Sequence, residues 1–401
     1  MLSVEEALEQ VLSRARVLPT ERVDLLTALG RVLAEPVVSR RELPPWANSS
    51  MDGYAVRAAD TGPTPRELRL VGRVTAGALP ERPVGPGETV RIFTGAPLPG
   101  GADAVIAQED VTTTPAGITV AAEVLPGTFV RPAGEDVKVG DLVLEPGRPL
   151  APADIGLLAT LGASRVSVYR RPRVAILSTG SELADLGTEP GPGQIPNANT
   201  YSLMAQTLEA GAEPINLGVV EDDLAAIEER IGWGMAAADV LVSSAGVSVG
   251  ELDLVKEALT RSGAELHLWL VSMRPGKPIT FGSLGERAVF GLPGNPVSAM
   301  VTFELFVRPF LRKMGGHLAF GRPRLRARAQ APIPNPGRRR GYLRVSLTAD
   351  NGGWGARLTG DQGSGILRSM TQADGLAVVP PDTTLHPGDT VEVLVLREIR
   401  V

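Results

Sequence analysis

The sequence contains no cysteine, few aromatic residues and no long uncharged apolar segment. Because cysteine is absent from all 401 residues, disulfides, thiolate metal sites and cysteine nucleophiles are excluded. Aromatic residues make up 4% of the chain, which argues against a protein that stacks on the bases of nucleic acids. No apolar run is long enough to cross a bilayer. These absences leave a water-soluble protein without thiol chemistry as the expectation.

The chain also lacks an excess of positive charge. The 40 basic residues are outnumbered by 45 acidic ones, which gives a formal net charge of −5. Such a chain has no general positive field to attract DNA or RNA. The N-terminus, Met1-Leu-Ser-Val-Glu-Glu-Ala7, reads as a capped acidic helix and not as a signal peptide. We therefore expect a cytoplasmic protein that binds neither nucleic acid nor membranes.

Between residues 173 and 296, one pattern occurs four times: an apolar strand followed by a glycine-rich turn with polar groups. Continuous apolar runs are typical of strands buried on both faces of a parallel α/β sheet. Such sheets bind ligands beyond the carboxyl ends of their strands, so the four turns predict one ligand-binding edge. The turns are Thr179-Gly180-Ser-Glu182, Ser244-Ala-Gly-Val-Ser248-Val-Gly250, Arg274-Pro-Gly-Lys277-Pro278 and Leu292-Pro293-Gly-Asn295-Pro296.

The remaining sequence predicts a multidomain α/β plus β protein. Short β-prone runs cut by proline and glycine predict a small β insertion domain over 53–136. The C-terminal alternation predicts a second small β domain over 319–401, which we expect to be β-barrel-like, with a sandwich as the alternative. A discontinuous helical and mixed linker domain over 1–52 and 137–170, and a doubly wound α/β domain over 171–318, complete the division. Besides the N-terminal helix, helices are expected at 21–33, 199–210, 222–237, 251–261 and 297–313.

Acidic residues follow the same strand ends. They are Glu182, Asp222 and Asp253, each placed after an apolar run. Carboxylates beside a phosphate-binding turn repel the phosphate unless a cation such as Mg²⁺ lies between them and binds oxygen atoms of both the carboxylates and the phosphate. Each acid also has a structural explanation, because Asp222 can cap the next helix and Asp253 can lie in a first helical turn. The three together favour a metal or substrate site.

Groups that suit an anion lie beside these acids. Arg274 and Lys277 stand on a proline-braced turn, which suits an oxyanion and equally a solvated surface turn. Asn295 as N-cap and Pro296 at the first position predict a helix start whose N–H groups can bind an anion. The loop through Ser248 imitates a nucleophile loop, but the sequence places none of the three histidines as its base, which disfavours a serine hydrolase.

Eight strings, in order along nearly the whole chain, resemble the MoeA/gephyrin family of molybdopterin molybdenumtransferases. Any one of them is weak evidence, whereas the ordered set is highly specific. They are Ser50-Met-Asp52-Gly-Tyr-Ala55, Arg91-Ile-Phe-Thr94-Gly-Ala96, Gly134-Glu-Asp136, Ser178-Thr-Gly-Ser-Glu-Leu183, Ser244-Ala-Gly-Val-Ser-Val-Gly-Glu251 with Asp253, Pro275-Gly-Lys-Pro278, Gly291-Leu-Pro-Gly-Asn-Pro-Val-Ser298 and Gln362-Gly-Ser364-Gly365.

The resemblance implies an activity and partners. Members insert molybdate into adenylylated molybdopterin and release AMP, so molybdate and adenylylated molybdopterin are the expected substrates and Mg²⁺ the expected cofactor. It also implies an elongated homodimer, in which the insertion domain of one subunit caps the α/β site of the other. A molybdopterin adenylyltransferase and other proteins of cofactor synthesis are candidate partners.

On the matching positions, the resemblance and the turn chemistry together assign site residues. We expect catalytic roles for Asp52, Glu182, Asp222, Asp253 and Lys277, with Glu182, Asp222 and Asp253 as metal ligands. We expect substrate contacts from Thr94, Asp136, Thr179, Gly180, Ser248, Arg274, Pro293, Asn295, Pro296, Ser298 and Ser364.

The sequence departs from the family pattern in places that leave the carboxylates intact. Arg274 stands where lysine is usual, Ala198 lacks a hydroxyl within Ile195-Pro-Asn-Ala-Asn199, and Leu254 stands where tyrosine is common. Two other functions stay open. A scaffold that binds the pterin without catalysis gains nothing from three uncompensated acids. The adenylyltransferase step is disfavoured by the β insertion and the C-terminal β domain.

Overall fold

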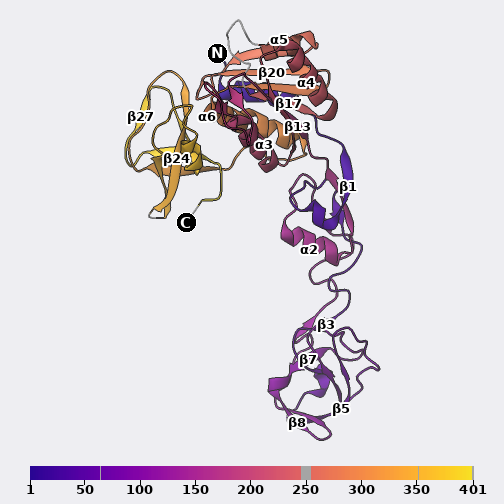
Figure 1. Cartoon of the computed structure of the whole chain (residues 1–401). Coiled ribbons are helices and arrows are strands. Elements are labelled where there is room, and N and C mark those ends of the chain that lie inside the picture. Colours follow the sequence, from indigo (N-terminus) through magenta and orange to yellow (C-terminus); the bar gives the residue numbers. More distant parts are fainter. Residues whose placement is uncertain (64, 245–253, 351, 400–401) are drawn as a thin grey trace. The chain divides into compact units, whose positions relative to one another are not determined.

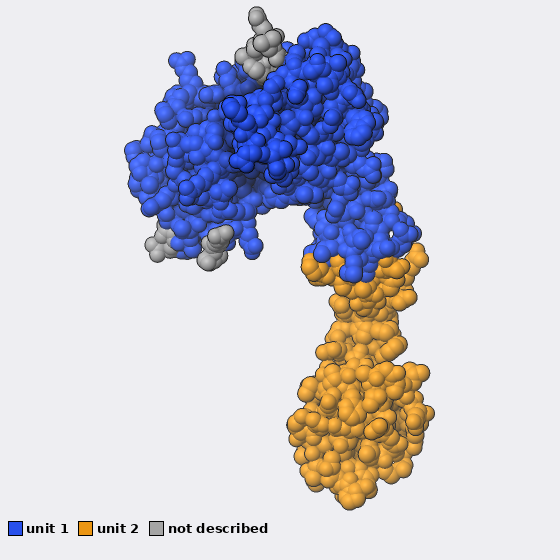
Figure 2. Space-filling view, viewed as in Figure 1, with its two compact units in different colours: residues 1–34, 147–151, 165–401 blue, residues 35–146, 152–164 orange. Residues whose placement is uncertain are grey.

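A computed structural model describes residues 1–63, 65–244, 254–350 and 352–399 of the chain, which divides into two compact units (Figures 1 and 2). Unit 1 comprises residues 1–34, 147–151 and 165–401, and unit 2 comprises residues 35–146 and 152–164. The four-domain division expected from the sequence is finer than these units, and its boundaries stay predictions. Among the described residues, no helix combines the length and the apolar character needed to cross a membrane.

Unit 1 contains a six-stranded sheet in the order β16-β13-β17-β21-β20-β18. The first four strands are parallel neighbours, whereas β20 is antiparallel to both β21 and β18. The sheet is therefore mixed. Because β18 runs in the same direction as β21, the four strands that precede the predicted turns all end at one edge of the sheet. These strands are β13, β17, β18 and β21. The strands are β13 Arg173–Thr179, β16 Glu213–Val220, β17 Val240–Ser244, β18 Glu265–Leu270, β20 Pro278–Leu284 and β21 Arg287–Leu292.

Helices cover both faces of this sheet (Figure 1). Alternate residues of β13 point to opposite faces, so Val174 and Ile176 join one core while Ala175 and Leu177 join the other. This arrangement confirms the doubly wound α/β domain, and the helices lie close to their expected positions. They are α1 Val4–Ser13, α3 Ala198–Glu209, α4 Leu224–Ala237, α5 Leu254–Arg261, and the continuous segment α6 Pro296–Thr302, π-helical η4 Phe303–Val307 and α7 Arg308–Met314.

The C-terminal region forms a closed barrel of five strands. The order β24-β25-β22-β28-β26 closes because β26 also pairs with β24. Leu343, Val345, Ala377 and Val393 lie buried inside it, which confirms the barrel-like C-terminal fold. The elements are β22 Arg324–Ala329, β24 Arg340–Asp350, β25 Gly353–Leu358, β26 Gly375–Val379 and β28 Thr390–Val395, accompanied by β19 Met273–Arg274, β23 Ile333–Asn335, β27 Thr383–Leu385 and α8 Arg368–Thr371.

The N-terminal segment contains one confirmed and one incorrect helix prediction. In α1, the Glu6 N–H donates to Ser3 Oγ at 3.1 Å and the Ser3 N–H to Glu6 Oε2 at 2.7 Å, which forms the expected capping box. The helix predicted over 21–33 is wrong. Instead β1 Thr20–Asp24 pairs antiparallel with β12 Arg165–Tyr169, and the short 3₁₀ turn η1 Leu25–Ala28 follows. This long-range pairing overrides the local helical spacing.

Unit 2 is built on a six-stranded sheet in the order β7-β4-β6-β5-β9-β8. Alternate residues of β4 face different cores, Tyr54 and Val56 one of them and Ala55 the other. This is the small β domain expected from the proline- and glycine-rich sequence. The elements are β2 Val37–Val38, β3 Asn48–Ser49, β4 Gly53–Val56, β5 Arg66–Val74, β6 Glu88–Ile92, β7 Ala104–Ala107, β8 Val111–Thr114, β9 Gly117–Val120, β10 Val130–Arg131, β11 Leu142–Leu144, α2 Pro152–Thr160 and the 3₁₀ turns η2 Ala58–Asp60 and η3 Gln108–Asp110.

Candidate functional site

Three of the predicted turns begin at the same level of the sheet in unit 1. Ser178 of β13 pairs with Ser244 of β17, which in turn pairs with Leu292 of β21. The turns that follow these strands therefore start side by side at the carboxyl edge. This is the position at which open α/β sheets bind their ligands.

The side chain of Asn199 joins the end of β17 to the turn after β21. Its Nδ2 donates to Ser244 Oγ at 2.7 Å and to the carbonyl oxygen of Gly294 at 2.7 Å. The start of α3 is itself fixed, because Asn197 accepts the Thr200 N–H at 3.3 Å and the hydroxyls of Thr200 and Ser178 lie 2.7 Å apart. Asn199 was not among the predicted site residues, although it lies in the string Ile195-Pro-Asn-Ala-Asn199, where Ala198 departs from the family pattern.

A cavity of about 110 Å³ opens beside this amide group. One wall comes from a short parallel pair of strands, β14 Leu183–Ala184 and β15 Ile195–Pro196. Among the predicted site residues, Thr179, Glu182 and Pro296 line the cavity. Its full lining is Thr179, Glu182, Leu183, Ile195, Pro196, Asn197, Ala198, Asn199, Ser244, Gly294 and Pro296.

Two predicted carboxylates meet at the turn after β13. Gly180 has φ +144°, and a Cβ there would lie 2.3 Å from Glu182 Oε2, so the turn folds this carboxylate back over a glycine. Asp222 Oδ2 accepts the Ser181 N–H at 3.3 Å and lies 3.5 Å from its hydroxyl. Asp222 is not the helix cap: Asp223 caps α4 by accepting the Ala226 N–H at 2.8 Å. The structural explanation for Asp222 is therefore incorrect.

These two acids suit a hard divalent cation by their chemistry. Both are exposed carboxylates held at one turn, and oxygen donors of this kind are the ligands that Mg²⁺ prefers. Among the residues described, no three His, Cys, Asp or Glu side chains form a group that could hold a metal ion. The expected third ligand, Asp253, and the expected substrate contact Ser248 lie outside the described residues.

The turn that carries Arg274 and Lys277 packs against α6. Gly276 has φ +96°, and a Cβ there would lie 2.4 Å from Thr302 Oγ1 and 3.5 Å from the carbonyl oxygen of Ser298. The Lys277 carbonyl accepts the Val271 N–H at 2.8 Å, and Lys277 is an exposed residue. The structure therefore brings Arg274 and Lys277 to the helix that carries Ser298.

The start of α6 differs from the prediction of open backbone donors. The Val297 N–H donates to the carbonyl oxygen of Ser364 at 3.1 Å. Asn295 is the N-cap, but its side chain forms no capping hydrogen bond. The prediction of a free N–H for an anion is therefore wrong for Val297, because its N–H already donates to Ser364, in the segment after the barrel strand β25. The same contact brings Ser364 beside Pro296 and the turn with Pro293.

In unit 2, Asp52 and Thr94 form a tight pair. Asp52 directly precedes β4 and Thr94 comes shortly after β6, and these two strand ends are paired, since Gly53 lies opposite Ile92. Asp52 Oδ1 accepts the Thr94 N–H at 2.8 Å and its hydroxyl at 2.7 Å. These two hydrogen bonds, with a smaller contribution from Arg91, hold the pKa of Asp52 below its usual value. Asp136 lies exposed on a separate turn of the same unit, anchored by its N–H to the Leu43 carbonyl at 2.8 Å.

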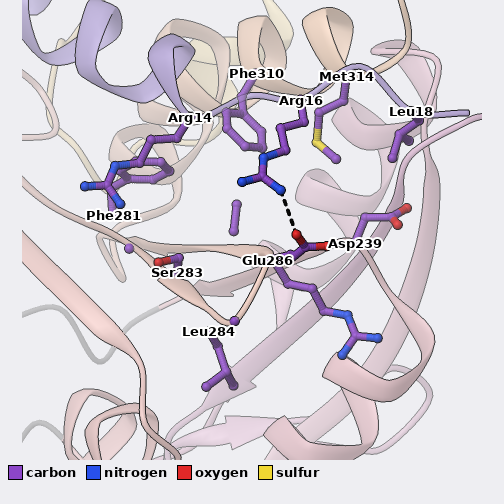
Figure 3. Close-up of a pocket in the computed structure, with 14 residues that line it drawn as sticks. Arg14, Arg16, Leu18, Asp239, Phe281, Ser283, Leu284, Glu286, Phe310 and Met314 are labelled. Atoms are coloured by element: carbon purple, nitrogen blue, oxygen red, sulfur yellow. Dashed lines mark hydrogen bonds and ion pairs between the residues drawn. The ribbon is translucent and has the colours of Figure 1, made fainter.

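A larger cavity, about 500 Å³, lies at the opposite edge of the sheet (Figure 3). Phe281, Phe310 and Met314 contribute its apolar wall, and the exposed ion pair of Arg16 with Glu286, at 2.7 Å, spans two of its segments. No predicted site residue lines it, and it lies where the parallel strands begin. Volume alone is therefore a poor guide here, and the polar carboxyl edge is the better candidate.

The chain is similar to known proteins over most of its length. The chain matches three family models: the MoeA N-terminal region (domain I and II) over residues 2–162, the "Probable molybdopterin binding domain" over residues 175–313, and the MoeA C-terminal region (domain IV) over residues 326–396. The candidate edge lies within the second of these. The fold and site thus define a multidomain protein whose α/β domain is of the molybdopterin-binding type.

Similar proteins cover the chain almost from end to end. A molybdopterin molybdenumtransferase of Nostoc sp. is 40% identical over 94% of this chain and 89% of its own length. One of Bacillus subtilis is 34% identical over 99% and 94%. The structure of a molybdopterin biosynthesis MoeA protein from Pyrococcus horikoshii OT3 has a TM-score of 0.85 at 32% identity, covering 99% and 100%. The chain belongs to the molybdopterin molybdenumtransferase family, and it is accordingly a transferase of molybdenum cofactor biosynthesis.

The bridge formed by Asn199 predicts a local effect on two turns. In Asn199→Asp the donor that holds Ser244 and Gly294 is lost, and each lost hydrogen bond weakens the attachment by about 1 kcal/mol. We expect amide hydrogen exchange of Leu292, Gly294 and Asn295 to accelerate about tenfold or more, with little change in the melting temperature. Ser202→Ala, on the same helix, is the control and should leave exchange in this turn unchanged. Equal exchange in both variants would contradict the role of Asn199.

Proposed function

We propose that the carboxyl edge of this sheet inserts molybdate into adenylylated molybdopterin and releases AMP, with Mg²⁺ as the metal cofactor. The observation that carries this is that polar turns gather at this edge with two carboxylates: Glu182, which lines the cavity, and Asp222, which accepts the N–H of the neighbouring Ser181. A pyrophosphate ligand needs donors close to its oxygens, and carboxylates next to it need a cation between them. The edge supplies both kinds of group.

The cationic turn would hold the anionic parts of the substrates. Arg274 and Lys277 can form charge-assisted hydrogen bonds to phosphate or molybdate oxygens, and Arg274 can do so through two parallel N–H groups. The hydroxyls of Ser298 and Ser364 lie on the neighbouring helix and on the turn joined to it. The remaining proposed substrate contacts are Thr179, Gly180, Ser248, Pro293, Asn295 and Pro296.

Glu182 and Asp222, with Asp253, would hold the magnesium ion. When bound, Mg²⁺ neutralises and polarises pyrophosphate oxygens. The chain itself contributes the orientation: Gly180 lets Glu182 fold over the turn, and the Ser181 N–H directs the Asp222 carboxylate. Asp222 remains available for this role because Asp223 caps the helix.

The proposed reaction requires no side-chain nucleophile, in keeping with a chain without cysteine. Water attacks one phosphorus of the pyrophosphate, the bridging P–O bond breaks, and AMP leaves while the other phosphate stays on the pterin. Molybdate forms two Mo–S bonds with the two thiols of the pterin, and one of its oxygen atoms leaves as water with the two thiol protons. Molybdenum keeps its oxidation state throughout.

Substitution of the carboxylates tests the metal assignment. We expect Glu182→Gln and Asp222→Asn to slow AMP release on the order of 100-fold, because each removes a charge that acts on the developing transition state. Both groups are exposed, so the melting temperature should hardly change. AMP release is measured at increasing Mg²⁺ concentration, and higher Mg²⁺ should partly restore each single variant.

Asp223→Asn is the matched control, since asparagine caps a helix as well as aspartate does and the residue adjoins Asp222. It should release AMP at the rate of the unsubstituted protein. If Glu182→Gln and Asp222→Asn also keep that rate and its Mg²⁺ dependence, the assignment of these carboxylates is wrong.

We further propose a homodimer in which Asp52, with Thr94 and Asp136, serves the sheet edge of the second subunit. The family resemblance implies this arrangement, and the ionised, exposed Asp52 is a suitable group to act on a ligand outside its own unit. In such a twofold assembly each of two equivalent sites takes residues from both chains. A protomer with a defect in one unit could then be rescued by a protomer with a defect in the other.

Mixing two inactive variants tests this arrangement. Asp52→Asn and Glu182→Gln homodimers should each be nearly inactive, whereas a mixed dimer has one doubly defective site and one intact site. Random reassortment makes half of the dimers mixed, so an equal mixture should recover about a quarter of full activity. Mass spectrometry verifies that mixed dimers have formed. No recovery in their presence would place both residues in one subunit's site or remove Asp52 from the reaction.

A further inference from the structure

Arg344 is a fully buried cation outside the barrel core. It lies in β24 between Leu343 and Val345, whose side chains fill the barrel, so its own side chain emerges on the other face of the strand. Its exposed fraction is 0%, because the segment after β25 folds over its side chain. A buried guanidinium needs a reason, since its desolvation is costly unless its donors are satisfied.

The acceptors of this guanidinium come from one turn and the helix after it. Nη1 donates to the carbonyl oxygen of Gln362 at 3.1 Å, and Nη2 donates to those of Asp361 at 3.3 Å and Gly363 at 2.9 Å. Nε donates to Ser369 Oγ at 2.9 Å. None of these four acceptors is a carboxylate. Burial lowers the pKa of Arg344 to about 10. The nearby Asp361 raises this pKa and the nearby Arg274 lowers it further. The guanidinium therefore stays charged at neutral pH.

The contacts are reciprocal and fix the turn rather than the barrel. The backbone N–H of Arg344 donates to Gln362 Oε1 at 2.8 Å, and Gln362 Nε2 donates to the Arg344 carbonyl at 3.3 Å. Three successive carbonyls thus point toward one guanidinium, and the next residue is Ser364. Its carbonyl accepts the Val297 N–H at 3.1 Å, at the start of α6. A continuous series of hydrogen bonds therefore runs from β24 through the turn to the sheet edge.

We propose that Arg344 is a positioning residue that holds Ser364 at the sheet edge and so completes the molybdate-binding part of the site. This rests on the proposed function of that edge. Arginine suits the task because its planar group carries five donors in a fixed fork, whereas the ammonium of lysine is a single point that cannot reach three carbonyls and a hydroxyl together. Arg344 itself touches no reacting atom; it acts through the turn.

The first test measures the turn directly. In Arg344→Lys we expect amide exchange of residues 361–366 and of Val297 to accelerate at least tenfold in the full-length protein. Val345→Ala, on the same strand but facing the barrel core, is the control: it should destabilise the barrel without a selective effect on the turn. Should Arg344→Lys fail to fold, Gln362→Ala removes the two hydrogen bonds that join the Gln362 side chain to the backbone of Arg344, and it should loosen the same turn in weaker form.

The second test separates positioning from general stability. Arg344→Lys and Ser364→Ala should each raise the KM for molybdate about tenfold and change the KM for adenylylated molybdopterin much less. The double variant should be no worse than Ser364→Ala alone, because both changes act on one element. Val345→Ala should keep the KM for molybdate.

Either of two results overturns the positioning role: unchanged exchange of the turn in Arg344→Lys, or a loosened turn with an unchanged KM for molybdate. Fully additive effects of Arg344→Lys and Ser364→Ala would overturn it as well. Failure of the proposed function itself would look different, because the unsubstituted protein would then release AMP without any response to molybdate.

Discussion

The parallel alignment of β13, β17 and β21 is the constraint on which the candidate site depends. Neighbouring parallel strands in register must send their following turns out at one edge and at one level, whatever the sequence of the turns. Glycine-rich turns can then approach a ligand with their backbones, and polar side chains that follow the strands gather without any contact in the sequence. The antiparallel β20 interrupts the sheet without changing this, because β18 again ends at the same edge.

Side chains from outside the turns organise this edge. The Asn199 amide joins the end of β17 to the turn after β21, and the Ser364 carbonyl satisfies a donor at the start of α6. The guanidinium of Arg344 in turn holds the segment that carries Ser364. The barrel is thereby coupled to the α/β sheet through specific polar contacts. A group in the barrel can then influence ligand binding at the sheet without touching the ligand.

The sequence was informative where local pattern and motif order decide the structure. The buried strands, the helices after them and the β character of the insertion and of the barrel-like C-terminal domain followed from apolar runs, glycine and proline placement and the ordered family strings. The helix expected over 21–33 failed because β1 pairs with β12, far away along the chain, and a local pattern cannot show such a partner. Asn199 was missed for the same reason, since it bonds Gly294 across 95 positions.

The same limit applies to charge. Nothing in the string Leu343-Arg344-Val345 distinguishes a fully buried guanidinium from one of the many exposed arginines of this chain; only the covering turn makes it buried. Conversely, Asp222 and Asp223 look equivalent in sequence, but the structure gives them different partners. Asp222 accepts the Ser181 N–H, whereas Asp223 accepts the Ala226 N–H. Tertiary contacts therefore assign roles that residue type and spacing leave undecided.

The most direct measurement is AMP release from adenylylated molybdopterin by the unsubstituted protein, with molybdate, with sulfate and with neither. If the sheet edge couples oxyanion binding to cleavage of the pyrophosphate, differential binding of molybdate completes the reactive geometry, so release should rise with molybdate and sulfate should substitute poorly. Equal release in all three conditions would contradict the coupling of molybdate insertion to AMP release at this site.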